Sequence, residues 1–128
     1  MLIIHSTKVG INMPHVVLNG KTSIGEIFER FEPLFIRREG IILKTVDFFI
    51  NREKNAILID SLVVTSGGNT VFLAYISGRG DGVVIRLFPK MAVEKTEYVK
   101  RTLVELAKQL LTKFPDLKVG DTNLGDYF

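Results

Sequence analysis

The chain holds few residues whose types and spacing could support chemistry. His5 and His15 are its only histidines, and the sequence offers no further ligands that would complete a metal site. The absence of cysteine excludes a disulfide scaffold, a zinc–thiolate site and a cysteine nucleophile. No Ser/His/Asp arrangement, HExxH pattern or Walker loop occurs. We therefore expect no metal, no cofactor and no catalytic residue, and the pattern favours a protein that is not an enzyme.

Two polar segments resemble ligand-binding loops. Residues 77–82 read Ser-Gly-Arg-Gly-Asp-Gly, and glycines can bring backbone amides close to phosphate. Phosphate loops join a strand to a helix, however, whereas this segment lies between two predicted strands and contains Asp81-Gly82, a hairpin-turn pair. Residues 121–126 place oxygen ligands at alternate positions but lack the glycine and terminal glutamate of a calcium loop. We predict a hairpin turn and a polar tail.

Charged residues offer two further hypotheses. Asp47 and Asp60 lie inside apolar runs, where an inward, unpaired carboxylate would be costly, so we expect both to face solvent. Arg37 and Arg38 could form part of a basic patch with nearby lysines, and the chain has a net charge of +3. Interspersed glutamates indicate a mixed solvated surface instead. Nucleic-acid binding is therefore possible in principle but is not the favoured function.

The hydrophobic pattern predicts the elements that must position any site. Short strands are expected at 2–9 and 15–19, before a helix that starts with the capping box Ser23-Ile24-Gly25-Glu26. Four strands follow at about 41–50, 55–65, 70–78 and 82–89, and their short turns predict an antiparallel meander. A β-bulge near Lys44-Thr45 would keep the first of these strands in phase. A long amphipathic helix is expected at about 93–114.

These elements predict one α+β domain over residues 1–128. Its order is β-α-β4-α, with a possible extra N-terminal strand, and a curved antiparallel sheet should pack against the long C-terminal helix. Apolar residues make up 46% of the chain and charged residues 24%, as in ordinary globular proteins. No apolar run approaches the roughly 18 residues that a membrane span needs. The composition favours a cytoplasmic protein from a thermophile, with an archaeal source as the expectation.

The predicted strands are apolar on both faces. Leu73 and Tyr75 share one parity of the third run of the meander, while Phe72 and Ala74 share the other. A sheet with one wet face should alternate apolar and polar residues, so a helix, a ligand or a second subunit should cover the other face.

The order of elements resembles two architectures. An early strand, the segment Ser23-Ile24-Gly25-Glu26-Ile27-Phe28, the strand block and a closing strand at 82–88 that leads into the long helix are similar to the helix-grip fold of START-like proteins. The resemblance covers about residues 15–114. The same order also resembles the saddle repeat of the TATA-box-binding protein. The START-like resemblance implies an apolar ligand held between sheet and helix, and it assigns no functional residue.

We therefore predict a small protein that binds an apolar molecule between sheet and helix. The predicted lining residues come from both helices and from the strands: Phe28, Phe31, Phe48, Leu73, Ile85, Leu103 and Leu106. Taken singly, each of these residue types is more often part of an ordinary core than of a pocket. The alternative is a homodimeric interaction module that packs through its sheet and holds no ligand, and nucleic-acid binding comes third.

Overall fold

The computed structural model describes residues 13–90 and 92–128. The predicted strand at 2–9 lies outside the described residues. Within them, the elements follow in the order β1 (His15–Asn19), α2 (Ile24–Arg30), β2 (Phe35–Arg38), β3 (Ile41–Ile50), β4 (Ala56–Thr65), β5 (Gly68–Gly78), β6 (Gly82–Leu87), α3 (Glu97–Lys113), β7 (Lys118–Thr122) and the short 3-10 helix η1 (Gly125–Tyr127).

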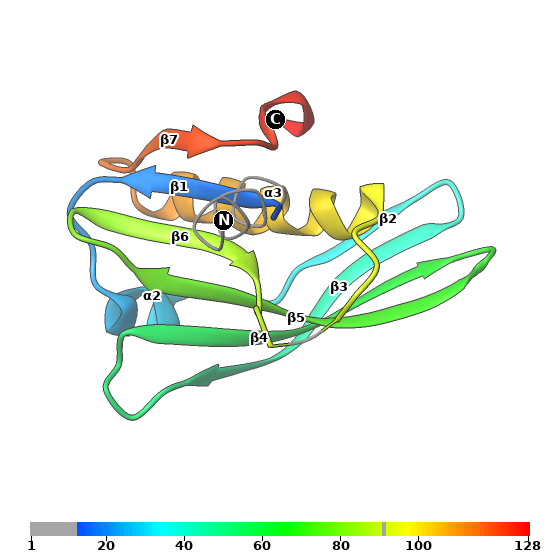
Figure 1. The fold of residues 1–128 in the computed structure, drawn as a ribbon, viewed down its shortest axis with the longest axis horizontal. Helices are drawn as coiled ribbons and strands as arrows, with labels where there is room; N and C mark the ends of the chain where they lie inside the picture. The colour runs from blue at the N-terminus through cyan, green and yellow to red at the C-terminus, as the bar shows by residue number, and fades with distance from the viewer. Residues whose placement is uncertain (1–12, 91) are drawn as a thin grey trace, which may run out of the picture.

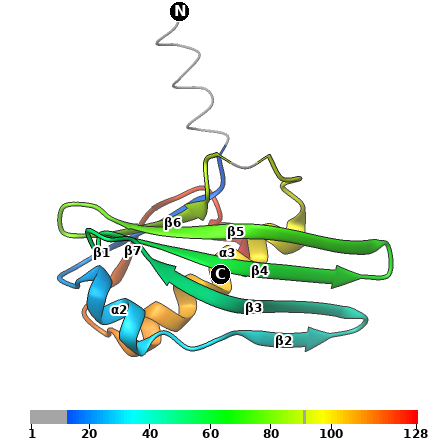
Figure 2. The same cartoon turned by 90° about the horizontal axis from the view of Figure 1, so that it is seen from below.

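The strands form one curled antiparallel sheet in the order β2-β3-β4-β5-β6-β1-β7. Strand β1 closes the meander by pairing with β6 on one side and with β7 on the other. Both helices lie on the concave face, where the sheet curves round them as an open half-barrel (Figures 1 and 2). The predicted α+β class, with a curved antiparallel sheet against a long C-terminal helix, is confirmed.

The predicted irregularity in β3 occurs slightly later than the sequence indicated. The register passes from Thr45 opposite Ser61 to Phe48 opposite Ile59, so β3 carries one extra residue at Val46-Asp47. This bulge keeps Thr45 and Phe48 on the concave face. Because Val46 falls inside the bulge, it is 48% exposed and does not join the core.

Two edge strands, β2 and β7, were not predicted from the sequence. The β2–β3 hairpin turns through Glu39 and Gly40, whose φ angles of 39° and 81° are the positive pair that a tight two-residue turn requires. β7 follows Pro115 and pairs with β1, although residues 118–122 have little hydrophobic pattern. Both strands lie at the edges of the sheet. An edge strand pairs with a neighbour on one side only, so it needs fewer apolar residues than a central strand.

The long helix follows its sequence pattern closely. Thr96 caps it by accepting a hydrogen bond from Val99 N at 3.2 Å, and the helix ends at Lys113, two residues before Pro115. The predicted apolar stripe is buried against the sheet and consists of Val99, Leu103, Leu106, Leu110 and Phe114. No helix among the described residues combines the length and the apolar character that crossing a membrane requires.

The shorter helix starts as predicted and is tied to α3 at its other end. Ser23 caps α2 by accepting a hydrogen bond from Glu26 N at 3.1 Å. Beyond α2, the Glu32 backbone N–H donates to Gln109 Oε1 at 2.7 Å, and Gln109 Nε2 donates back to Glu32 O at 3.0 Å. The Lys113 ammonium donates to the Glu32 carboxylate at 2.6 Å. These contacts fix where the chain leaves α2 and enters β2.

The Lys113 contact makes this junction sensitive to pH. Its hydrogen bond and positive charge hold the pKa of Glu32 below the ordinary 4.5. A lowered pKa in the folded state stabilises the protein above the unfolded pKa, and that stability is lost as the pH falls through the folded value. We expect Glu32→Gln to lower the free energy of unfolding slightly at pH 7, and the deficit should vanish at strongly acid pH.

Urea unfolding of wild type and variant from pH 2 to 7 measures this difference. Glu29→Gln is the matched control, because Glu29 is exposed at the same end of α2 and makes no ion pair with any residue that the structure describes. A Glu32→Gln deficit of the same size at pH 2 and pH 7 would contradict the assigned cause.

Candidate ligand-binding site

A cleft of about 200 Å³ opens between the first turns of α3 and the β2–β3 hairpin. This part of the fold is found in Figure 1 where the yellow start of α3 lies near the cyan β2–β3 hairpin. A dry engineered cavity of about 150 Å³ accepts benzene, so the space suits a small organic molecule. The lining residues are Ile36, Arg38, Ile41, Leu43, Tyr98, Arg101 and Glu105.

The strand side of the cleft is set by the register of the β2–β3 hairpin. Ile36 lies opposite Leu43, and Arg38 lies opposite Ile41, so all four residues share the concave face of the sheet. Leu43 is 5% exposed, while Ile36 and Ile41 are partly buried against the core. Three aliphatic side chains therefore form an apolar floor, and the exposed Arg38 stands at the rim.

The helix side of the cleft comes from one stripe of α3. Tyr98, Arg101 and Glu105 are spaced by three and four residues, which places them on the same helix face. This stripe lies beside the buried stripe of α3, and Tyr98 also packs partly against the hydrophobic core. The cleft thus has an apolar base and a polar margin, an arrangement typical of sites that bind small organic molecules.

The charges around the cleft leave one positive charge uncompensated. Arg101 Nε lies 3.3 Å from Glu97 Oε2, and Glu105 lies 3.6 Å from Lys108. The Arg101 guanidinium also lies over the Tyr127 ring, 5.3 Å from its centroid. Arg38 makes no ion pair with any of the residues 13–90 and 92–128. The rim is therefore weakly positive.

Six of the seven predicted lining residues belong to the core or pack against it. Ile85, Leu103 and Leu106 are 0% exposed, and Phe31 is 8% exposed. Phe28 and Phe48 are partly buried against them, and the Phe31 and Phe48 rings meet edge to face with centroids 5.4 Å apart. None of the six lines the cleft, because the centre of the half-barrel is filled by its own side chains.

Leu73 requires a correction. The sequence pattern predicts Leu73 between sheet and helix, but its neighbours Phe72 and Ala74 are the side chains of β5 that point into the core, at 1% and 0% exposure. Because successive side chains of a strand point to opposite faces, Leu73 lies on the convex face, away from both helices.

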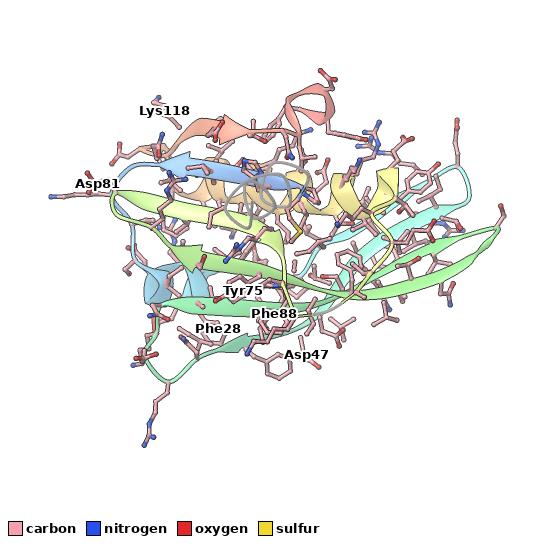
Figure 3. All side chains as sticks on the ribbon, viewed as in Figure 1. Phe28, Asp47, Tyr75, Asp81, Phe88 and Lys118 are labelled. Atoms are coloured by element: carbon pink, nitrogen blue, oxygen red, sulfur yellow. The ribbon has the colours of Figure 1, made fainter. Side chains whose placement is uncertain are left out.

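The convex face of the sheet is largely apolar, and no described helix covers it (Figure 2). Phe35, Phe49 and Val71 are 65%, 55% and 64% exposed. Figure 3 shows Tyr75 and Phe88 close together, and their ring centroids are 5.4 Å apart. These two rings line a second depression, of about 240 Å³, with Phe49, Ile50, Asn51, Ala56 and Leu58.

The remaining sequence hypotheses have simple structural outcomes. Within the segment 77–82, residues 79–81 form the β5–β6 turn, which is closed by a hydrogen bond from Arg79 N to Gly82 O at 2.9 Å. Asp47 is exposed in the bulge, and Asp60 is partly exposed on β4. His15 lies 3.9 Å from Asp121, whereas His5 falls outside the described residues. Within 13–90 and 92–128, no three His, Cys, Asp or Glu side chains gather in a way that could hold a metal ion.

The sequence contained partial signals for the cleft. It indicated Arg38 as part of a basic patch. It missed Ile36 because β2 was not predicted. It did not indicate Arg101 and Glu105, because only the curl of the sheet brings them opposite the β2–β3 hairpin.

Comparison with known proteins adds no family to this description. The chain matches no protein-family model, no curated protein and no solved structure.

Proposed function

We propose that this is a cytoplasmic binding protein for a small apolar molecule, which lies in the cleft between α3 and the β2–β3 hairpin. One observation carries the proposal: an open space of about 200 Å³ has an aliphatic floor of Ile36, Ile41 and Leu43. Burying apolar ligand surface there contributes roughly 25 cal/mol per Å². The site differs from the one expected at the centre of the half-barrel, where the side chains are already close-packed.

The ligand would lie between sheet and helix, as the resemblance to the helix-grip fold implies, but at one end of α3 rather than at the centre of the half-barrel. At that end the floor is accessible without displacing core side chains. Tyr98 and Ile36 are only partly buried there, so a bound molecule would complete their packing.

A homodimer is the second candidate, and the convex face of the sheet favours it. Phe35, Phe49 and Val71 lie exposed on a face that no described helix covers. Large apolar patches on monomeric proteins are uncommon and mark interaction surfaces. Two copies stacked through this face would remove these side chains from water. This candidate and the ligand site use opposite faces of the sheet.

Native mass spectrometry of the purified protein tests the two candidates together. The ligand-binding proposal expects a mass above the 14.4 kDa chain by a small-molecule increment, which denaturation should release. Ile36→Ser should abolish the increment because Ile36 lines the cleft. Phe35→Ser is the matched control: its side chain is next in sequence, points to the convex face, and should leave the increment unchanged.

The other outcomes are equally decisive. A clean dimer without an increment, converted to monomer by Phe35→Ser but not by Ile36→Ser, would favour the interaction module and contradict ligand carriage. An increment that Ile36→Ser leaves in place would locate the molecule outside the cleft and overturn the proposed site.

A further inference from the structure

We infer that the molecule held in the cleft is a monocarboxylic acid, whose carboxylate binds at Arg38 and Arg101 while its apolar part lies on the aliphatic floor. This inference rests on the proposed function and names the chemistry that the site would recognise. It follows from the kind, number and pairing of the charges that surround the cleft.

Arg38 supplies the uncompensated charge. It stands on the concave face beside Ile36 and opposite Ile41, so its guanidinium is attached at the edge of the apolar floor. It has no acidic partner among the described residues. A carboxylate at the rim would give Arg38 the charge-assisted hydrogen bonds that the protein itself does not provide.

Arg101 supplies a second, oriented donor on the opposite wall. Glu97 contacts its Nε, and the Tyr127 ring lies against its guanidinium, so two groups restrict the side chain. Arginine carries five N–H donors in a planar fork, and the Glu97 contact at Nε involves only one of them. The exposed Glu97 pair is weak, with both side chains about half exposed, and it can share Arg101 with a ligand.

Glu105 limits the ligand to a single negative charge. It lines the same wall as Arg101, and Lys108 only partly offsets its charge from 3.6 Å away. The three charged residues that line the cleft are Arg38, Arg101 and Glu105, so the lining carries one net positive charge. A monoanion matches that surplus, whereas a dianionic phosphate monoester would be repelled by Glu105. The small volume favours an aromatic ring or a short alkyl chain.

Two matched pairs of probes test the inference: 2-naphthoate with 2-naphthalenemethanol, and octanoate with 1-octanol. Each pair shares its apolar body and differs in the charge of its head group. Titrations of the 128-residue chain, followed by amide chemical shifts, should show each acid binding about tenfold or more tighter than its alcohol, because hydrogen bonds to a charged group are the stronger ones. The acids should bind more weakly at high salt.

Variants of neighbouring arginines on β2 separate a defined contact from general charge attraction. Arg38→Gln should remove most of the preference for the acid. Arg37→Gln removes the same charge one residue away, but Arg37 lies opposite Ile42 on the convex face, so affinity should stay within about twofold of wild type. Both arginines are exposed, so both variants should fold, and unfolding midpoints verify this.

Each other result overturns a stated part of the argument. Equal binding of acid and alcohol at the cleft would reject the carboxylate inference and leave the proposed function standing. Failure of all four probes to shift cleft amides would reject both. Equal losses in Arg37→Gln and Arg38→Gln would show nonspecific attraction, and tighter binding of naphthyl phosphate than of naphthoate would reject the monoanion assignment.

Discussion

Leu106→Ala should lower the free energy of unfolding by about 2–5 kcal/mol. Leu106 is 0% exposed on the buried stripe of α3 and belongs to the core that the concave face of the sheet encloses. Removing its side chain forfeits apolar burial and leaves a cavity that the curled sheet cannot fully close. The sequence analysis placed Leu106 in a ligand pocket, and its packing instead predicts a structural role. Urea unfolding monitored by circular dichroism measures the loss.

Leu73→Ala is the control for this prediction. It deletes the same side chain from a residue that the sequence also assigned to the pocket, but Leu73 is only partly buried on the convex face of β5. We expect a loss of roughly 1 kcal/mol or less in the monomer. A Leu106→Ala variant as stable as wild type would mean that α3 does not pack on the sheet as described.

Gly82→Ala should lower the free energy of unfolding by roughly 2–5 kcal/mol. Gly82 begins β6 opposite Asn19, at the point where β1 passes closest to it. A Cβ at this position would overlap the backbone carbonyl oxygen of Leu18, and the Gly82 φ of 156° is one that other residues rarely adopt. Because the obstruction is backbone, only separation of β1 from β6 could relieve it.

Gly25→Ala provides the comparison. Gly25 lies in the first turn of α2, and a Cβ there would meet no atom within 4 Å. Alanine has the better helix propensity, so we expect this variant to gain about 0.5 kcal/mol. Thermal unfolding should therefore move the two variants in opposite directions. Similar midpoints for both would contradict the close approach of β1 and β6.

Local sequence patterns were sufficient for most of the elements because local physics specifies them. Ser23 caps α2 as the capping box predicted, and the four runs of the meander became β3 to β6 with ends shifted by at most two residues. The predicted hairpin turn between β5 and β6 also forms, although its loop is Arg79-Gly80-Asp81 and Gly82 already belongs to β6.

The two strands that the sequence did not predict, β2 and β7, depend on longer-range contacts. Strand β2 carries exposed Arg37 and Arg38, and β7 carries Gly120 and Asp121, so neither has the continuous apolar character by which strands are predicted. Each becomes a strand by hydrogen-bonding to an edge that the rest of the sheet provides. The sequence signal for β2 was its turn, Glu39-Gly40, rather than the strand itself.

The sequence by itself determined the α+β class, the antiparallel meander, the two amphipathic helices and the apolar character of both sheet faces. The tertiary structure decided which face of the sheet the helices cover, and it placed Leu73 on the convex face. It also placed Arg38 and Arg101 on the two walls of one cleft. The physical reason is the separation along the chain of the residues that interact. Periodicity and capping act over a few residues, whereas the curl of the sheet and the position of α3 depend on pairings such as that of β1 with β6, which join residues far apart in the chain.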